Sequence, residues 1–583
     1  MNETIGIIPR AFRRRGVWVA CTLLLRAGLN FLGLAMLLPV LALVLDPGSL
    51  EGGGVLTRAY EGLGFASQRT FALAVCAAVV GVIVLKCLLG LWLARVERTY
   101  IYDLYRTLSR RLLVTYHDRG LPFVKASNSA VLARNVNVVC LAFAAGVLKP
   151  AAAIAAEAML LVLLFGALMW YTPLAALLAL AVFLPSIWLY YGLVRNRINR
   201  YGELENKAQR EKARLVAETF RGYADIEINN AFPMMLRQFD RAMDQVIRTR
   251  LRETAIGLLP QTFTEVGLAV GMALLVALSL GDGDGRAQML FGVFAVAALR
   301  LMPSVRNIMT GWTAIKYNRY TIGILRDAAA DCPPAPANPD CRGYPGNPGN
   351  PAADTASSPE KLPFRHEIAV RDLRFRFADG GRELFHGLSL TIRKGERIGI
   401  RGASGAGKTT LFNLLLGLYE PSGGEIAIDG TPLTAANRRA WQNRIGYVSQ
   451  NLFIADGSFA ANVALGIPAG EVDRERVMQA LRAAQLGELV TGLAKGIDTH
   501  VGECGCRLSG GQRQRIGIAR ALYRQADVLF FDEATSALDS RTEEEINRSI
   551  AGLAARDAGL TLVVIAHRES SLEYCNRIIT IGE

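Results

Sequence analysis

Charged residues are scarce in this sequence. Asp, Glu, Lys and Arg make up 20% of its 583 residues, against about 25% in an average soluble domain. Hydrophobic residues make up 51%, and the mean hydropathy is +0.25. This composition argues against a wholly soluble chain. It also excludes a mainly disordered chain, because disorder requires low hydrophobicity and a high density of charge.

The sequence also lacks the cysteine pattern of a disulfide-stabilised protein. Its nine cysteines are scattered over the chain, and several lie inside apolar runs, so they predict no disulfide framework. Two pairs, Cys332 with Cys341 and Cys504 with Cys506, offer only two ligands each, and we expect neither to hold a metal ion. We expect no cleavable signal peptide, because the first apolar run is too long and lacks an A-x-A-like site.

The net charge of +14 is unevenly distributed. Residues 364–583 hold 27 Lys and Arg against 26 Asp and Glu, so residues 1–363 hold 38 against 25. The basic excess therefore belongs to the apolar part of the chain. Lys and Arg clustered beside long apolar runs are typical of the cytoplasmic flanks of membrane helices. We expect membrane lipids, and no nucleic acid, among the partners.

Six stretches are long and apolar enough to cross a bilayer, which requires about 20 mostly apolar residues. They cover about residues 17–45, 71–94, 139–170, 174–194, 255–280 and 287–309. The segments before the first span, after the second and after the fourth are rich in Arg and Lys. The sequence therefore predicts a cytoplasmic amino terminus. The long connections 95–138 and 195–254 favour helix, which predicts spans that continue beyond the bilayer.

A phosphate-binding motif follows a strand-like segment in the second half of the chain. Gly402-Ala-Ser404-Gly405-Ala-Gly407-Lys408-Thr409 matches G-x-x-x-x-G-K-[ST], and an apolar helical segment beginning at Thr410 comes next. The glycines let backbone N–H groups surround the phosphates, Lys408 reaches the β- and γ-phosphates, and Thr409 offers a hydroxyl to Mg²⁺. The start of the helix adds a favourable dipole. The sequence therefore predicts an ATP site.

An apolar strand that ends in two carboxylates lies downstream of this motif. It reads Asp527-Val-Leu-Phe-Phe-Asp532-Glu533. At this distance after a phosphate-binding loop, we expect Asp532 to hold Mg²⁺ and Glu533 to polarise the attacking water.

Between the two motifs, Leu508-Ser509-Gly510-Gly511-Gln512 resembles the LSGGQ signature of the ABC transporter ATPases. Three further segments are similar to loops of that family: Gln450 lies in a sequence like the Q-loop, Asp539 in one like the D-loop, and His567 stands where the family has its switch histidine. This resemblance implies that Gln450 and His567 act with Glu533, that Gln450 helps hold Mg²⁺, and that Asp539 contributes to the nucleotide site. Where the family commonly stacks adenine on a Tyr, this sequence has Phe377, with Phe375 two residues earlier, and plain core packing is the alternative role for either ring. Cys504 stands where exporters often have Arg.

The resemblance also implies an assembly. ABC exporters enclose ATP between the phosphate-binding loop of one ATPase domain and the signature of another, and this sequence contains one of each. Because every ATPase element is intact, we expect a homodimer rather than a heterodimer. The expected fold is an all-α transmembrane domain of six helices over residues 1–328, a Pro- and Gly-rich linker over 329–363, and an α/β P-loop ATPase domain over 364–583. Short helices that seat in grooves of the ATPase domains are expected near 118–126 and 206–215.

Segments of the membrane half are similar to bacterial flippases of polyprenyl-diphosphate-linked oligosaccharides, which implies a lipid-linked cargo and an inner-membrane location. Basic residues inside or near the spans are compatible with a diphosphate, because a charge in hydrocarbon usually faces a water-filled interior. They are Arg26, Lys86, Lys149, Arg300 and Arg306, against Glu157 and Glu265. An exporter of peptides, lipopeptides or drugs is the alternative. A regulator or channel gated by ATP is disfavoured by the intact Glu533 and His567.

Overall fold

The chain forms two compact units, Met1–Pro336 and Ala337–Glu583. The computed structural model describes residues 7–35, 62, 68–171, 173–279, 286–330, 361–377 and 383–533, together with parts of 541–582. The division falls within the Pro-rich stretch 329–363, most of which lies outside the described residues.

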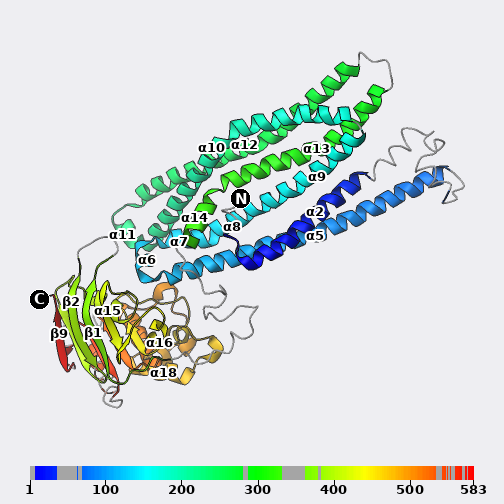
Figure 1. Ribbon diagram of the computed structural model, residues 1–583. Helices are drawn as coiled ribbons and strands as arrows, with labels where there is room; N and C mark the ends of the chain where they lie inside the picture. The colour runs from blue at the N-terminus through cyan, green and yellow to red at the C-terminus, as the bar shows by residue number, and fades with distance from the viewer. Residues whose placement is uncertain are drawn as a thin grey trace. The chain divides into compact units, whose positions relative to one another are not determined.

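The first unit consists of long helices (Figure 1). They are α2 (Arg10–Ala35), α5 (Gln68–Asp118), α9 (Lys149–Tyr171), α10 (Pro173–Arg221), α12 (Phe232–Ser279) and α13 (Arg286–Tyr317). Shorter helices join or follow them: α6 (Gly120–Ala126), α7 (Ser129–Arg134), α8 (Cys140–Phe143), α11 (Tyr223–Ile228) and α14 (Tyr320–Ala330). Helix α2 packs along α5 and α9, while α10, α12 and α13 pack against one another.

Large apolar side chains cover the outer surface of these helices. Trp170 is 87% exposed and Leu91 is 70% exposed, which is unfavourable in water and suited to lipid. Within the described part of the chain, three helical stretches are long and apolar enough to cross a membrane: Phe12–Gly33, Thr70–Asp118 and Ser129–Trp170. The predicted spans 174–194, 255–280 and 287–309 lie in α10, α12 and α13 and stay predictions as spans.

One continuous helical stretch runs from α7 to the end of α9 and contains two π turns. The first is η2 (Asn135–Val139) and the second is η3 (Ala144–Leu148). Pro150 follows the second π turn. Because proline has no N–H to donate and its ring collides with the preceding turn, a wider turn before it relieves the clash.

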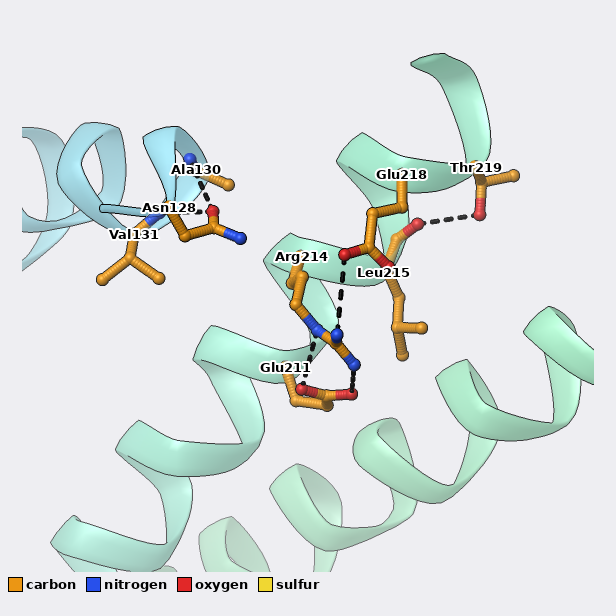
Figure 2. Close-up of polar contacts among 8 residues, drawn as sticks. All are labelled: Asn128, Ala130, Val131, Glu211, Arg214, Leu215, Glu218 and Thr219. Carbon is orange, nitrogen blue, oxygen red and sulfur yellow. Dashed lines mark hydrogen bonds and ion pairs between the residues drawn. The ribbon is translucent and has the colours of Figure 1, made fainter. Parts of the chain in front are cut away.

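The helices extend well past the apolar stretches, as the sequence predicts. Ion pairs stabilise the polar, carboxyl-terminal part of α10. The Arg214 guanidinium lies 2.5 Å from the Glu211 carboxylate and 3.5 Å from that of Glu218 (Figure 2). The side chain of Asn128 caps α7 by accepting a 2.9 Å hydrogen bond from the Ala130 amide (Figure 2). Such local pairs and caps stabilise helices that leave the core.

One of the two predicted short helices is misplaced. The segment 118–126 does contain a short helix, α6. The prediction for 206–215 is wrong, because these residues lie inside α10, where Ala208 and Leu215 are buried. The chain turns only after Arg221, and the short helix at this turn is α11.

The second unit contains two sheets (Figure 1). The antiparallel sheet has the order β2-β1-β4-β5, from β2 (Phe385–Arg393), β1 (Glu367–Phe375), β4 (Gly423–Ile428) and β5 (Thr431–Pro432). The parallel sheet has the order β6-β7-β8-β3-β9, from β6 (Ile445–Val448), β7 (Val528–Asp532), β8 (Thr561–Ile565), β3 (Arg397–Gly402) and β9 (Arg577–Ile581).

This unit also contains the helices α15 (Lys408–Leu415), α16 (Arg438–Gln442), α17 (Phe459–Val463), α18 (Arg474–Ala483), α19 (Gly487–Thr491) and α20 (Gly510–Tyr523). Every residue of β7 and of β8 is buried, as expected for central parallel strands covered on both faces. The carboxyl ends of parallel strands meet at one edge of a sheet, where α/β proteins bind ligands. Strands β3, β6 and β7 all deliver candidate residues to this edge.

Candidate functional site

The phosphate-binding loop connects β3 to α15. Gly405 and Gly407 have φ angles of +83° and +94°, which side chains rarely adopt. A Cβ at Gly407 would also come within 2.9 Å of Leu384, so the sequence needs glycine here for two reasons. Ser404 is exposed in the loop, and Thr410 is half-buried in the first turn of α15.

Lys408 is buried at the start of α15. Its Nζ donates hydrogen bonds to the carbonyls of Gly402 at 2.9 Å and Ala403 at 3.0 Å. The ammonium group is therefore enclosed by its own loop, where it provides the positive charge of an anion site.

A hydroxyl and a carboxylate meet beside this loop. Thr409 Oγ1 lies 3.5 Å from Asp532 Oδ1, although the two residues are 123 positions apart. Asp532 is 1% exposed at the end of β7. Mg²⁺ prefers oxygen ligands of this kind and commonly takes one or two carboxylates together with phosphate oxygens. The pair thus suits the predicted metal role. Burial, and then the charge of Asp532, raises the pKa of the Tyr447 hydroxyl.

The backbone conformation of Glu533 differs from that of the strand residue before it, Asp532. Glu533 has a φ angle of +51°, and its N–H donates to the carbonyl of Ile565 at 2.9 Å. This left-handed conformation turns the side chain away from the strand direction. Gln450 follows β6, and its side-chain Nε2 donates a hydrogen bond to Glu533 Oε2 at 2.9 Å. The structure therefore brings together the predicted Gln450 and Glu533.

The signature residues begin α20. Ser509 accepts a hydrogen bond from the Gln512 amide at 3.2 Å, and the Gln512 side chain accepts one from the Ser509 amide at 2.9 Å. This reciprocal capping box orders the first turn. The N–H groups of Gly510 and Gly511 lie in that turn, and a helix start of this kind can bind an anion.

The structure separates the two candidate phenylalanines. Phe375 is buried and stacks on Tyr419, with ring centroids 5.4 Å apart and planes at 11°. Phe377 lies beyond the end of β1 and is 44% exposed. Phe375 is therefore a core residue, and Phe377 is the ring that remains accessible to a ligand. The predicted Asp539 and His567 lie outside the described residues.

The cationic candidates in the helical unit have different surroundings. Arg26 forms a 3.0 Å ion pair with Glu97. Lys86 is half-buried against Gly33, where an added Cβ would come within 2.9 Å of Nζ. Lys149 is exposed and Arg306 is half-buried, while the Arg300 side chain lies outside the described residues.

Glu97, the partner of Arg26, is absent from the predicted site. The only signal for it in the sequence is that it is one of three acids, with Asp103 and Asp118, among the basic residues that follow the second span. Glu157, predicted as an intramembrane acid, accepts hydrogen bonds from Ser304 Oγ at 2.7 Å and Asn307 Nδ2 at 2.9 Å. These bonds join α9 to α13.

Comparisons with known proteins agree with this geometry. Residues 385–536 match the family model described as ABC transporter. An ATP-dependent lipid A-core flippase of Burkholderia pseudomallei (strain 1710b) is 30% identical over 534 residues, which cover 89% of this chain and 84% of the relative. The flippase of the same description from Ralstonia nicotianae is 31% identical over 423 residues, covering 71% of this chain and 67% of the relative.

A solved structure shares the fold. It is described as a bacterial Atm1-family ABC exporter with ATP bound, and it matches with a TM-score of 0.74 and 22% identity over 98% of this chain and 94% of that one. A helical membrane part followed by a two-sheet ATPase part is therefore the architecture of this chain. The chain belongs to the ABC transporter family, as an exporter whose single polypeptide joins membrane-spanning helices to a domain that hydrolyses ATP to drive transport.

Proposed function

We propose that this exporter is a flippase of lipid-linked oligosaccharides of the polyprenyl-diphosphate type. In this proposal it works as a homodimer in the bacterial inner membrane, with its amino terminus and ATPase domain in the cytoplasm. The observation that carries the proposal is Lys86. It lies within the second predicted span, is half-buried, and makes no ion pair within the described part of the chain.

An unpaired cation in hydrocarbon is costly, so it is retained where a negative charge arrives during function. A diphosphate would supply that charge, whereas an uncharged drug would not. Arg26 contributes less, because Glu97 already neutralises it. The curated relatives are named for a lipid cargo, which favours a lipid over the alternative cargo class of peptides, lipopeptides or drugs.

The ATP site would work through the residues described above. ATP with Mg²⁺ supplies the free energy through cleavage of its terminal phosphate. Lys408 would transfer its hydrogen bonds from loop carbonyls to phosphate oxygens, and Thr409, Gln450 and Asp532 would hold Mg²⁺. Glu533 would polarise the attacking water, with His567 beside it.

The other nucleotide contacts complete the proposed site. The adenine would stack on the accessible ring of Phe377. Because the signature surrounds the nucleotide from a second copy in this family, two chains would form two equivalent sites. The residues that would contact ATP are Phe377, Gly402, Ser404, Gly405, Gly407, Lys408, Thr409, Thr410, Ser509, Gly510, Gly511, Gln512 and Asp539.

The test uses proteoliposomes that contain the full chain and a polyprenyl-diphosphate oligosaccharide. The Lys86→Gln/Arg300→Gln double variant is expected to flip this lipid several-fold more slowly than wild type while its basal ATPase activity persists. Arg106→Gln/Arg110→Gln, on α5 beyond the apolar stretch, removes the same charge, is the matched control and is expected to flip normally.

Two outcomes contradict the proposal at different levels. Undiminished flipping by the double variant would show that Lys86 and Arg300 do not take part in lipid transport. Failure of wild type to move any polyprenyl-diphosphate lipid, together with ATPase stimulation by a peptide or drug, would assign the exporter to the alternative cargo class.

A further inference from the structure

Helix α5 carries a groove at the point where its apolar stretch ends. The groove has a volume of about 480 Å³ and follows one stripe of the helix. Leu91 and Ala94 line one end, Arg95, Arg98 and Thr99 the middle, and Tyr102 and Asp103 the other end. Since the second predicted span ends at residue 94, the groove crosses the expected boundary between hydrocarbon and headgroups.

The two arginines of this groove are not neutralised by a carboxylate within the described residues. Arg95 and Arg98 are both exposed, and neither makes an ion pair in the part of the chain that the structure describes. The carboxylate between them in sequence, Glu97, faces the opposite side of α5, where it is 8% exposed and bonded to Arg26. Glu97 is therefore neutralised in the interior, whereas Arg95 and Arg98 remain on the surface.

The remaining polar groups define what the groove can hold. Thr99 Oγ1 donates to the carbonyl of Arg95 at 2.9 Å, so its hydroxyl is not a donor for a ligand. Two guanidinium groups and the exposed Tyr102 hydroxyl are donors, and donors are what phosphate oxygens require. Asp103 adds one negative charge at the end far from the apolar stretch, which leaves the groove with a net charge of about +1.

A second cluster of cations lies on helix α2, which packs against α5. Arg13, Arg14 and Arg15 are exposed on α2, and this part of α2 is fixed to α5 because the Tyr100 hydroxyl donates to the Phe12 carbonyl at 3.1 Å. Clustered Lys and Arg at the edge of a membrane attract anionic lipids. The surroundings therefore favour a ligand with net negative charge over a zwitterion.

We propose that the α5 groove binds the phosphodiester of an anionic phospholipid from the surrounding leaflet. Arg95 and Arg98 hold the phosphate, and an acyl chain lies along Leu91, Ala94 and the exposed ring of Trp92. This lipid is not the transported cargo, and the inference does not depend on which cargo the exporter moves.

The experiment uses Trp92 as a reporter in nanodiscs that contain the full-length protein. Phosphatidylglycerol or phosphatidylcholine with brominated acyl chains is added at equal fractions, and quenching of Trp92 is taken as the difference between wild type and Trp92→Phe. Brominated phosphatidylglycerol is expected to quench several-fold more strongly. In Arg95→Gln/Arg98→Gln this ratio is expected to fall to about one.

The matched control is Arg106→Gln/Arg110→Gln, which removes the same charge from the same helix beyond the groove and is expected to keep the preference. Asp103→Asn leaves both arginines in place and is expected to raise the preference about two-fold. Basal ATPase activity and thermal stability of every variant are measured in parallel and are expected to match wild type.

Five results would overturn the proposal, and the first four concern phospholipids. These four are an unchanged preference in Arg95→Gln/Arg98→Gln, an unchanged or lower preference in Asp103→Asn, equal quenching by brominated phosphatidylethanolamine, and no quenching by any lipid. The fourth result would mean that protein, such as a second copy of the chain, covers this stripe. Quenching by a phosphorylated glycolipid alone would assign the groove to the cargo and would also contradict the proposal.

Discussion

The ATPase unit and the helical unit place their charged groups in different ways. In the ATPase unit, Asp532 and Glu533 come from the end of one short strand and meet Thr409 and Gln450 from two other segments. Each group lies at a strand end, in a loop or at the start of a helix, so a short motif fixes its position. In the helical unit, pairs such as Arg26 with Glu97 form where two long helices touch. The comparison teaches that motif spacing encodes the first kind of site, whereas helix packing encodes the second.

The largest expected effect tests the motif-encoded site. Glu533→Gln is expected to lower ATP turnover about a hundredfold or more, because the amide keeps the shape but cannot polarise water as the carboxylate does. ATP binding is expected to persist. Phosphate release and nucleotide binding by purified protein check this, with Glu471→Gln as an exposed control in the same unit. Wild-type turnover in Glu533→Gln would exclude Glu533 from the mechanism.

Lys408→Ala is expected to act on binding instead. Loss of the charge-assisted hydrogen bonds of the ammonium group removes about 1.5–3 kcal/mol, so affinity for ATP should fall about 10- to 100-fold. Equilibrium titration with a fluorescent ATP analogue measures this change. An unchanged affinity with slower turnover would show that Lys408 acts only in the transition state.

The helical unit is expected to respond to a change in packing rather than in chemistry. A Cβ at Gly202 of α10 would lie 1.9 Å from the backbone oxygen of Tyr317, so Gly202→Ala must push α10 and α13 apart. We expect a loss of about 1–3 kcal/mol of stability. Gly192→Ala is the control on the same helix, because nothing lies within 4 Å of its added Cβ. Equal thermal stability of the two variants in detergent would refute this account.

The smallest expected effect depends on pH. Burial, and then the carboxylate of Glu205, raises the pKa of Glu253, while Arg250 opposes the shift. The folded state therefore binds this proton more tightly than the unfolded chain does. Above the ordinary glutamate pKa of about 4.3, ionised Glu253 destabilises the fold.

Glu253→Gln removes this penalty. We expect the variant to melt about 1–2 °C higher than wild type at pH 7.5 and to lose this advantage near pH 4. Thermal melts across this pH range provide the measurement, with Glu203→Gln, exposed on α10, as the control. A gain that is the same at both pH values would show that ionisation is not its cause.

Much of the ATP site could be predicted because local rules determine it. Two glycines of the phosphate-binding loop adopt positive φ angles, which favour glycine at those positions. An apolar strand that ends in two acids places these acids at the edge of the sheet. The choice between Phe375 and Phe377 could not be predicted, because residues two apart share one face of a strand. Only the end of β1 at Phe375 releases Phe377 from the core.

The misplaced short helix has a different cause. Helix-favouring residues continue without a break through 206–215, so composition alone gives no turn there. The breakers come later, at Gly222 and at Asn229 and Asn230, where Asn230 has a φ angle of +51°. These helix-breaking residues locate the turn better than a comparison of sequence position with other exporters does. The Arg26–Glu97 pair was also beyond prediction, since it depends on how α2 meets α5.

The two π turns before α9 have a consequence for comparisons between relatives. The amide of Cys140 bonds to the carbonyl of Asn135, and the amide of Lys149 to that of Ala144, so each turn absorbs one residue more than an α-helix would. Each can be viewed as a single-residue insertion that the helix accommodates without breaking. A gap-free alignment to an exporter that lacks these turns would be one residue out of step after the first turn and two residues out of step after the second. Equivalences for Lys149 and Glu157 must therefore be counted from the carboxyl-terminal side of the insertions.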